Sequence, residues 1–152
     1  MNAKQEIRLI KVSDLRLWTE NPRDPIDESA SDYDVIRRAI DGNPKDWNLE
    51  KLLLEMGNYY DFSEIPTVVY VNNSPVVYDG NRRVAILKYL QDSKLYSDIS
   101  GKLFLSQEPT QMTNLKEIPC NVCYRETALI NIERKHSNNG SWTVLQRDYF
   151  LH

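Results

Sequence analysis

The 152-residue chain contains only two cysteines, too few to build a disulfide framework in a protein of this size. No apolar run approaches the roughly 18 residues of a membrane span. The opening segment MNAKQEIRLI is too charged for the apolar centre of a signal peptide. Five glycines and seven prolines exclude a collagen-like or linker-dominated chain. Together these absences predict a cytoplasmic protein that makes no contact with a membrane.

The chain also lacks a large excess of either charge, since it has 22 acidic residues and 19 lysines and arginines, and its formal net charge is −3. The surface as a whole therefore cannot act as a polycation, and any contact with nucleic acid requires a local patch. With 41% hydrophobic and 27% charged residues, the chain has an ordinary globular composition. We expect one domain over residues 1–152, either a complete protein or the N-terminal part of a longer one.

Hydrophobic patterning alternates between strand and helix periods. It predicts strands over 7–17, 65–70, 76–78 and 118–124, and helices over 31–40, 49–56, 84–90, 126–136 and 142–150. Between residues 91 and 116 we expect at most one short helix. Cys120 and Cys123 have the spacing of a redox or zinc pair, but positions three apart on a strand point to opposite faces, so we expect buried free thiols. The order of elements predicts an α+β domain with a mixed β-sheet and packed helices.

The most informative motif is the turn Asp79-Gly80-Asn81-Arg82-Arg83, which joins a strand to an apolar helix. A helix start presents unpaired backbone N–H groups, which attract anions and phosphate above all. Two arginines in the first turn lie at the positive end of the helix dipole, and each such cation destabilises an exposed helix by roughly 0.3–1 kcal/mol. A compensating negative charge is therefore expected. Asp79 alone could supply it by capping the helix or pairing with one arginine, but we favour a bound phosphate or polyphosphate gripped by the arginines.

The order of these segments resembles the N-terminal domain of ParB-type chromosome partition proteins, which have the ParB/sulfiredoxin fold. The resemblance covers roughly residues 7–136 and includes Asn21-Pro22-Arg23, a Pro-x-Val-Val strand, a hairpin, and the segment 80–83 at the start of an apolar helix. In partition proteins of this family, a Gly-Glu-Arg-Arg motif at that place holds the phosphates of CTP. The resemblance implies a ParB/sulfiredoxin-like mixed sheet and a nucleotide site at Arg23, Asp79, Gly80, Asn81, Arg82 and Arg83.

A later segment, Ile132-Glu133-Arg134-Lys135-His136, is similar to the Glu-Asn-Leu-x-Arg helix of partition proteins, whose Glu and Asn help to hold Mg²⁺. The resemblance implies Glu133 as a Mg²⁺ ligand and a catalytic candidate, and Arg134 as a phosphate contact. His136, the only histidine besides the last residue, is a further catalytic candidate, because it could serve as a general acid. The spacing of Glu133 and His136 also occurs in helical metal sites, although one pair makes an incomplete site. From the residues themselves, we favour His136 as a contact at the C-terminus of its helix.

These patterns favour a ParB-like nucleotide-binding domain that holds CTP or ATP. It would act as a slow Mg²⁺-dependent nucleotide triphosphatase and switch contacts with DNA or a DNA-associated partner. DNA would meet a local patch or a missing C-terminal part, and a homodimer is a further expected assembly. A ParB-like DNA nuclease and a non-catalytic protein-interaction domain are the alternatives. Sulfiredoxins place a catalytic cysteine where this chain has Asn81, so sulfinic-acid reduction by that route is excluded.

Overall fold

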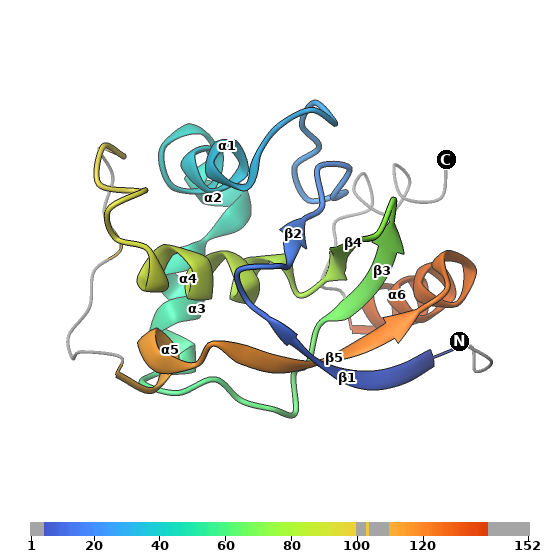
Figure 1. Cartoon of the computed structure of the whole chain (residues 1–152). Coiled ribbons are helices and arrows are strands. Elements are labelled where there is room, and N and C mark those ends of the chain that lie inside the picture. The colour runs from blue at the N-terminus through green and yellow to red at the C-terminus, as the bar shows by residue number, and fades with distance from the viewer. Residues whose placement is uncertain (1–4, 100–102, 104–109, 140–152) are drawn as a thin grey trace.

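A computed structural model describes residues 5–99, 103 and 110–139 of the chain (Figure 1). Its centre is a five-stranded sheet in the order β1-β5-β3-β4-β2. The strands are β1 (Gln5–Lys11), β2 (Arg16–Leu17), β3 (Thr67–Val71), β4 (Ser74–Asp79) and β5 (Glu117–Cys123). The helices are α1 (Asp32–Arg37), the π-helical turn η1 (Arg38–Gly42), α2 (Pro44–Trp47), α3 (Leu49–Met56), α4 (Asn81–Gln91), α5 (Thr110–Asn114) and α6 (Arg125–Asn139).

The sheet is mixed, as the sequence predicts. β1 with β5 and β3 with β4 are antiparallel pairs, whereas β3 with β5 and β2 with β4 are parallel pairs. Helices pack against this sheet, so the α+β prediction is confirmed. No helix within the described residues has the length and apolarity needed to cross a membrane.

The two faces of the sheet are covered by different helices. Val68 and Val77 belong to a core shared with α1, α3 and α4, while their neighbours Val69 and Tyr78 pack with α6 (Figure 1). This alternation is the two-residue period of a strand. Because of the same alternation, Cys120 packs in the first of these cores and Cys123 in the second. Both thiols are buried and free, as predicted. Burial raises the pKa of Cys120 to about 12 and also raises the pKa of Cys123.

Several predicted elements are confirmed closely. α3 has the predicted bounds, its four periodic apolar residues are buried, and Gly57 ends it with a positive φ of 69°. The predicted hairpin joins β3 to β4 through Asn72 and Asn73, whose φ angles of 50° and 65° fit a tight two-residue turn. α4 is buried along most of its length, as its apolar sequence indicates.

Other predictions are wrong in ways that burial explains. The strand expected over 7–17 is two strands, because Asp14 N and Leu15 N both donate to Lys11 O and turn the chain. Val12 and Leu15 are buried in that turn, so their apolar character marks the core rather than a strand. The segment before residue 49 contains α2, which begins at Pro44, a favourable first position for proline. The helix expected over 142–150 lies outside the described residues.

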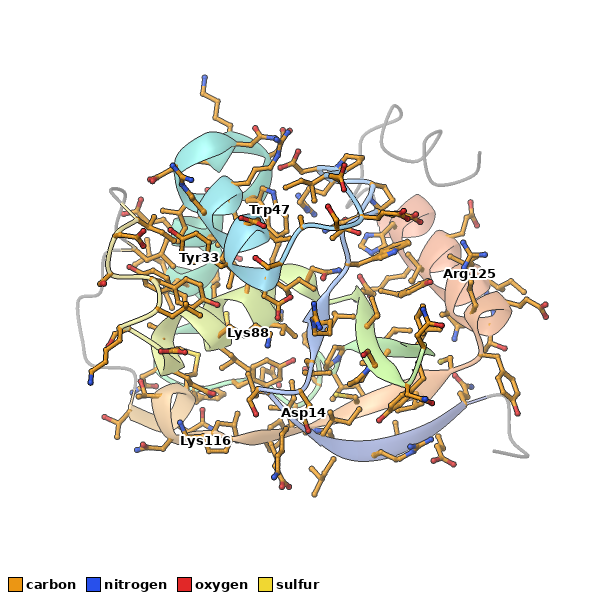
Figure 2. The ribbon with its side chains drawn as sticks, turned by 45° about the horizontal axis from the view of Figure 1, so that its top comes forward. Asp14, Tyr33, Trp47, Lys88, Lys116 and Arg125 are labelled. Carbon is orange, nitrogen blue, oxygen red and sulfur yellow. The ribbon has the colours of Figure 1, made fainter. Side chains whose placement is uncertain are left out.

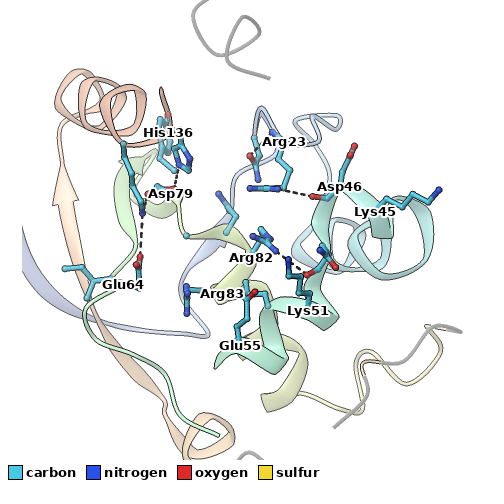
Figure 3. Close-up of a pocket in the computed structure, with 18 residues that line it drawn as sticks. Arg23, Lys45, Asp46, Lys51, Glu55, Glu64, Asp79, Arg82, Arg83 and His136 are labelled. Carbon is cyan, nitrogen blue, oxygen red and sulfur yellow. Dashed lines mark hydrogen bonds and ion pairs between the residues drawn. The ribbon is translucent and has the colours of Figure 1, made fainter. Parts of the chain in front are cut away.

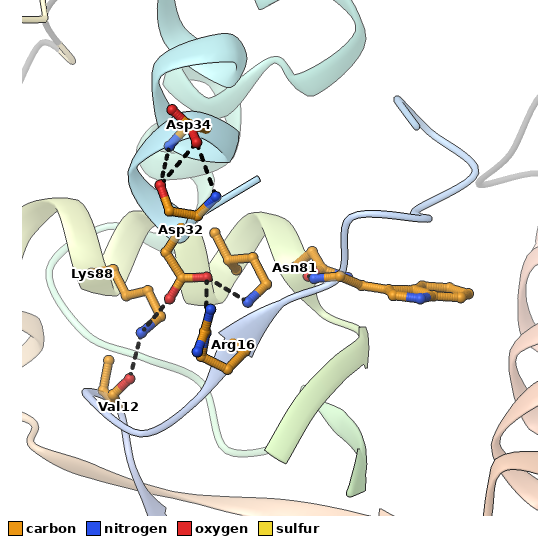
Figure 4. A network of polar contacts seen from close by, with 9 residues as sticks. Val12, Arg16, Asp32, Asp34, Asn81 and Lys88 are labelled. Atoms are coloured by element: carbon orange, nitrogen blue, oxygen red, sulfur yellow. Dashed lines mark hydrogen bonds and ion pairs between the residues drawn. The ribbon is translucent and has the colours of Figure 1, made fainter. Parts of the chain in front are cut away.

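A buried ion pair ties the helical layer to the sheet. Lys88 of α4 is only 8% exposed; its Nζ donates to Val12 O at 2.8 Å and lies 3.2 Å from Asp32 Oδ2 (Figures 2 and 4). Asp32 Oδ1 in turn accepts the Leu17 N–H at 2.8 Å. One lysine therefore links α4, α1 and the segment between β1 and β2. These contacts fix the axis of α4, whose first turn carries the arginines of interest.

Candidate functional site

The turn into α4 depends on Gly80. Its φ of 95° and ψ of 15° lie near the left-handed region, which glycine adopts without steric cost. A Cβ at Gly80 would lie 3.1 Å from Pro66 Cβ and 3.2 Å from Pro66 Cα. Both the backbone angle and the close approach therefore require glycine, and the start of α4 is held against the segment that leads into β3.

Asn81 braces the same turn from inside the protein. Its side chain is buried; Oδ1 accepts the Trp18 N–H at 2.9 Å, and Nδ2 donates to Val77 O at 2.9 Å. These contacts connect the segment after β2 to the end of β4. Asn81 therefore contributes to the site by fixing the backbone, since the polar atoms of its side chain are already used.

The first turn of α4 has no cap. No side chain bonds to its N-terminus, and its first turn contains no acidic residue. The first intrahelical bond is donated by Val84 N to Gly80 O at 3.1 Å, so the N–H groups of Asn81, Arg82 and Arg83 lie before it. Three backbone donors and the positive end of the helix dipole are therefore available to an anion.

These donors lie beside a pocket of about 510 Å³, a volume typical of small-molecule sites (Figure 3). The pocket is lined by the loop before α1, by α2 and α3, by the segment that leads into β3, by the β4–α4 turn, and by α6. Positive side chains outnumber carboxylates in its wall. The cations are Arg23, Lys45, Lys51, Arg82, Arg83 and Lys135, and the carboxylates are Asp46, Glu55, Glu64 and Asp79.

Arg82 is braced by backbone oxygens rather than by carboxylates. Its Nε donates to Trp47 O at 2.7 Å, and its Nη2 donates to Asn48 O at 3.2 Å. Trp47 is the last residue of α2, and Asn48 joins α2 to α3, where its carbonyl oxygen also accepts the Leu52 N–H at 3.3 Å. Burial lowers the pKa of Arg82 to about 10, and the positive charge of Arg23 acts in the same direction. The surroundings of Arg82 therefore disfavour its positive charge.

Arg83 is the neighbouring guanidinium in the pocket wall (Figure 3). It is half-buried, yet it forms no hydrogen bond or ion pair with any residue that the structure describes. A guanidinium carries five N–H donors and keeps its charge at neutral pH. The pocket thus contains a guanidinium whose N–H donors are bonded to no described residue and are available to a ligand.

Arg23 is brought to the same pocket from about sixty positions earlier in the chain. Its Nη1 donates to Asp46 O at 3.0 Å, and its backbone N–H donates to Asn21 Oδ1 at 3.1 Å. Burial lowers the pKa of Arg23, while the carboxylates of Asp46 and Asp79 oppose that shift. The structure therefore brings together the Asn-Pro-Arg segment and the Arg-Arg turn.

Asp79 is directed toward α6 rather than toward the arginines. Its Oδ1 accepts from His136 Nε2 at 2.9 Å, and its Oδ2 accepts from Lys135 Nζ at 3.0 Å. Burial acts to raise the pKa of Asp79, but these two contacts outweigh it, and the pKa lies below its usual value. The alternative that Asp79 caps α4 or pairs with one of its arginines is therefore wrong.

On α6, only part of the predicted set reaches the pocket. Lys135 and His136 line it, whereas Glu133 and Arg134 are not among the lining residues, and Arg134 is exposed and donates to Asn131 Oδ1 at 3.3 Å. α6 continues beyond the predicted end to Asn139, and His136 lies in its last turn, as expected, where its Nε2 is bonded to Asp79 Oδ1. The contact gives His136 a positioning role, and its catalytic role remains a prediction.

No metal centre is evident within the described part of the chain, where no three His, Cys, Asp or Glu side chains lie close enough to hold an ion. Glu133 as a Mg²⁺ ligand therefore remains a prediction. Five charged residues of the wall were not predicted from the sequence: Lys45, Asp46, Lys51, Glu55 and Glu64. No local motif marks them, because they join the pocket only through the packing of α2, α3 and the segment before β3 against α4 and α6.

No protein-family model, curated protein or solved structure matches the chain. The geometry and charge of the pocket are therefore what point to a ligand.

Proposed function

We propose that this pocket binds the phosphates of a nucleotide, CTP or ATP, and that the chain is a ParB-like nucleotide-binding domain. The observation that carries the proposal is Arg83, a half-buried guanidinium that forms no hydrogen bond or ion pair with a described residue and that stands at the uncapped start of α4. Helix starts and guanidinium groups are the two protein features that bind phosphate most readily.

The contacts suggest a division of roles. Arg83 and the free N–H groups of the first turn would hold phosphate oxygens directly. Arg82 would add positive charge while it continues to brace the end of α2, and Arg23, which donates to the neighbouring carbonyl of Asp46, would add a second positive charge. An anion placed among them would offset the mutual repulsion and the burial that lower the pKa of Arg82.

The bound nucleotide would act as a switch. Mg²⁺ would accompany the phosphates, slow hydrolysis would change the charge in the pocket, and that change would alter contacts with DNA or a DNA-associated partner. α6 is the element placed to respond, because Lys135 lines the pocket and also contacts Asp79 and Glu64.

Isothermal titration calorimetry with CTP, ATP and GTP, each with Mg²⁺, tests the proposal. We expect at least one nucleotide to bind with sub-millimolar affinity. Arg83→Gln should weaken that binding by about 10- to 100-fold, the effect of losing a charged hydrogen bond. Arg37→Gln is the matched control, because Arg37 is an exposed helical arginine outside the pocket. It should bind as the unaltered protein does.

The proposal fails if no nucleotide binds more tightly than about millimolar, or if Arg83→Gln and Arg37→Gln bind equally well. Metal-dependent nicking of supercoiled DNA that disappears in Glu133→Ala would instead favour the nuclease. Tight binding of a protein partner that persists after the charges of Arg82 and Arg83 are removed would favour the interaction domain.

A further inference from the structure

β1 forms a long outer edge of the sheet. It pairs with β5 on one side, and within the described ranges no strand pairs with its other side (Figure 1). The opposite edge of the sheet, β2, has only two residues, whereas β1 has seven. A strand of this length presents a row of backbone N–H and C=O groups that can pair with another strand.

One face of β1 is apolar and exposed. Ile7 is 61% exposed and Leu9 is 67% exposed, and residues two apart on a strand point the same way. The exposed pair therefore forms a short apolar stripe beside the edge. Pairing of the edge with a second strand would cover part of this stripe and remove apolar surface from water.

The other face of β1 carries opposite charges with the same spacing. Glu6 and Arg8 stand two residues apart, and within one chain they form an ion pair, with Arg8 also lying over the ring of Tyr70 at 5.4 Å. This arrangement is self-complementary. When two such strands run antiparallel about a twofold axis at Ile7, each Glu6 faces Arg8 of the partner subunit.

Other registers lack this match. An axis at Arg8 would place Arg8 against Arg8 of the partner subunit, and an axis at Glu6 would oppose two carboxylates. Like charges directly opposite each other destabilise a strand pair. An axis at Ile7 instead sets Ile7 against Ile7 of the partner subunit and Leu9 against Gln5 of the partner subunit. Among the twofold registers of β1 with itself, only the axis at Ile7 sets Glu6 opposite Arg8 of the partner subunit.

We propose that the chain forms a twofold homodimer in which β1 pairs antiparallel with β1 of a second copy, centred on Ile7, so that two five-stranded sheets become one. None of the residues that line the nucleotide pocket belongs to β1, so the pocket stays open in each copy. The dimer is therefore independent of the proposed function.

Sedimentation velocity over a concentration series provides the first test. The unaltered chain should dimerise, and Arg8→Glu should weaken the dimer at least about tenfold, because it sets two carboxylates against each other at both ends of the pair. The double variant Glu6→Arg/Arg8→Glu restores opposite charges in the same register and should regain the dimer. A simple loss of folding in Arg8→Glu would not be reversed in this way.

Cross-linking provides the second test. Ile7→Cys places two thiols opposite each other across the axis and should give a disulfide-linked dimer under mild oxidation. Leu9→Cys is the control and should not cross-link, because its neighbour across the axis is a glutamine. The native thiols are buried and their pKa values are raised, so they should not contribute. A monomer at every concentration, failure of the double variant to dimerise, or cross-linking through Leu9→Cys would overturn the proposal.

Discussion

Replacing Gly80 by alanine tests the turn on which the pocket depends. At a φ of 95° an alanine costs about 1–2 kcal/mol of left-handed backbone strain. Its Cβ would also lie 3.1 Å from Pro66 Cβ and 3.2 Å from Pro66 Cα. Because one of these atoms is backbone, the two segments must separate, and overpacking of this kind costs typically about 1–3 kcal/mol. We expect the free energy of unfolding to fall by about 2–5 kcal/mol.

Urea denaturation followed by tryptophan fluorescence measures this change. In thermal denaturation, the melting temperature should fall by about 10 °C, because each kcal/mol lowers it by roughly 2–4 °C in a chain of this length. Gly42→Ala is the control, because Gly42 lies at the end of η1 without a positive φ, and its added Cβ would approach only the flexible Arg38 side chain, at 3.4 Å. That variant should stay within about 1 kcal/mol of the unaltered protein. A Gly80→Ala variant as stable as Gly42→Ala would refute the reasoning.

The other predictions concern the polar contacts that hold the site together. Asp79→Asn should lower the free energy of unfolding at pH 7 by about 1–3 kcal/mol, because it removes the negative charge that Lys135 and His136 of α6 contact. The folded-state pKa of Asp79 is depressed, so its contribution is present above about pH 4 and is lost as the pH falls through the folded-state pKa. Urea titrations of the two proteins should therefore converge in acid. Asn81→Ala removes an acceptor from Trp18 N and a donor from Val77 O, and should cost about 2–4 kcal/mol in the same assay.

The role of Asn81 illustrates what a motif cannot convey. As part of Gly80-Asn81-Arg82-Arg83 it belongs to a motif from which phosphate binding was predicted, and its side chain is buried and bonded to the backbone of two other segments. Asp79 is a similar case, because its partners lie on α6, more than fifty residues away. Local sequence identified the turn correctly. It could not show which side chains of that turn face the pocket and which hold it in place.

Local sequence by itself determined the elements whose pattern is self-contained: α3 with its apolar face, the hairpin at Asn72 and Asn73, the buried helix α4, and the opposed cysteines of β5. Periodicity and turn chemistry act over a few residues, so they can be read directly from the chain. Tertiary structure alone decided that Arg83 forms no hydrogen bond or ion pair with a described residue, while Arg82 is bonded to α2 and Asp79 to α6. Those contacts join residues tens of positions apart, and only packing brings such residues within hydrogen-bonding distance.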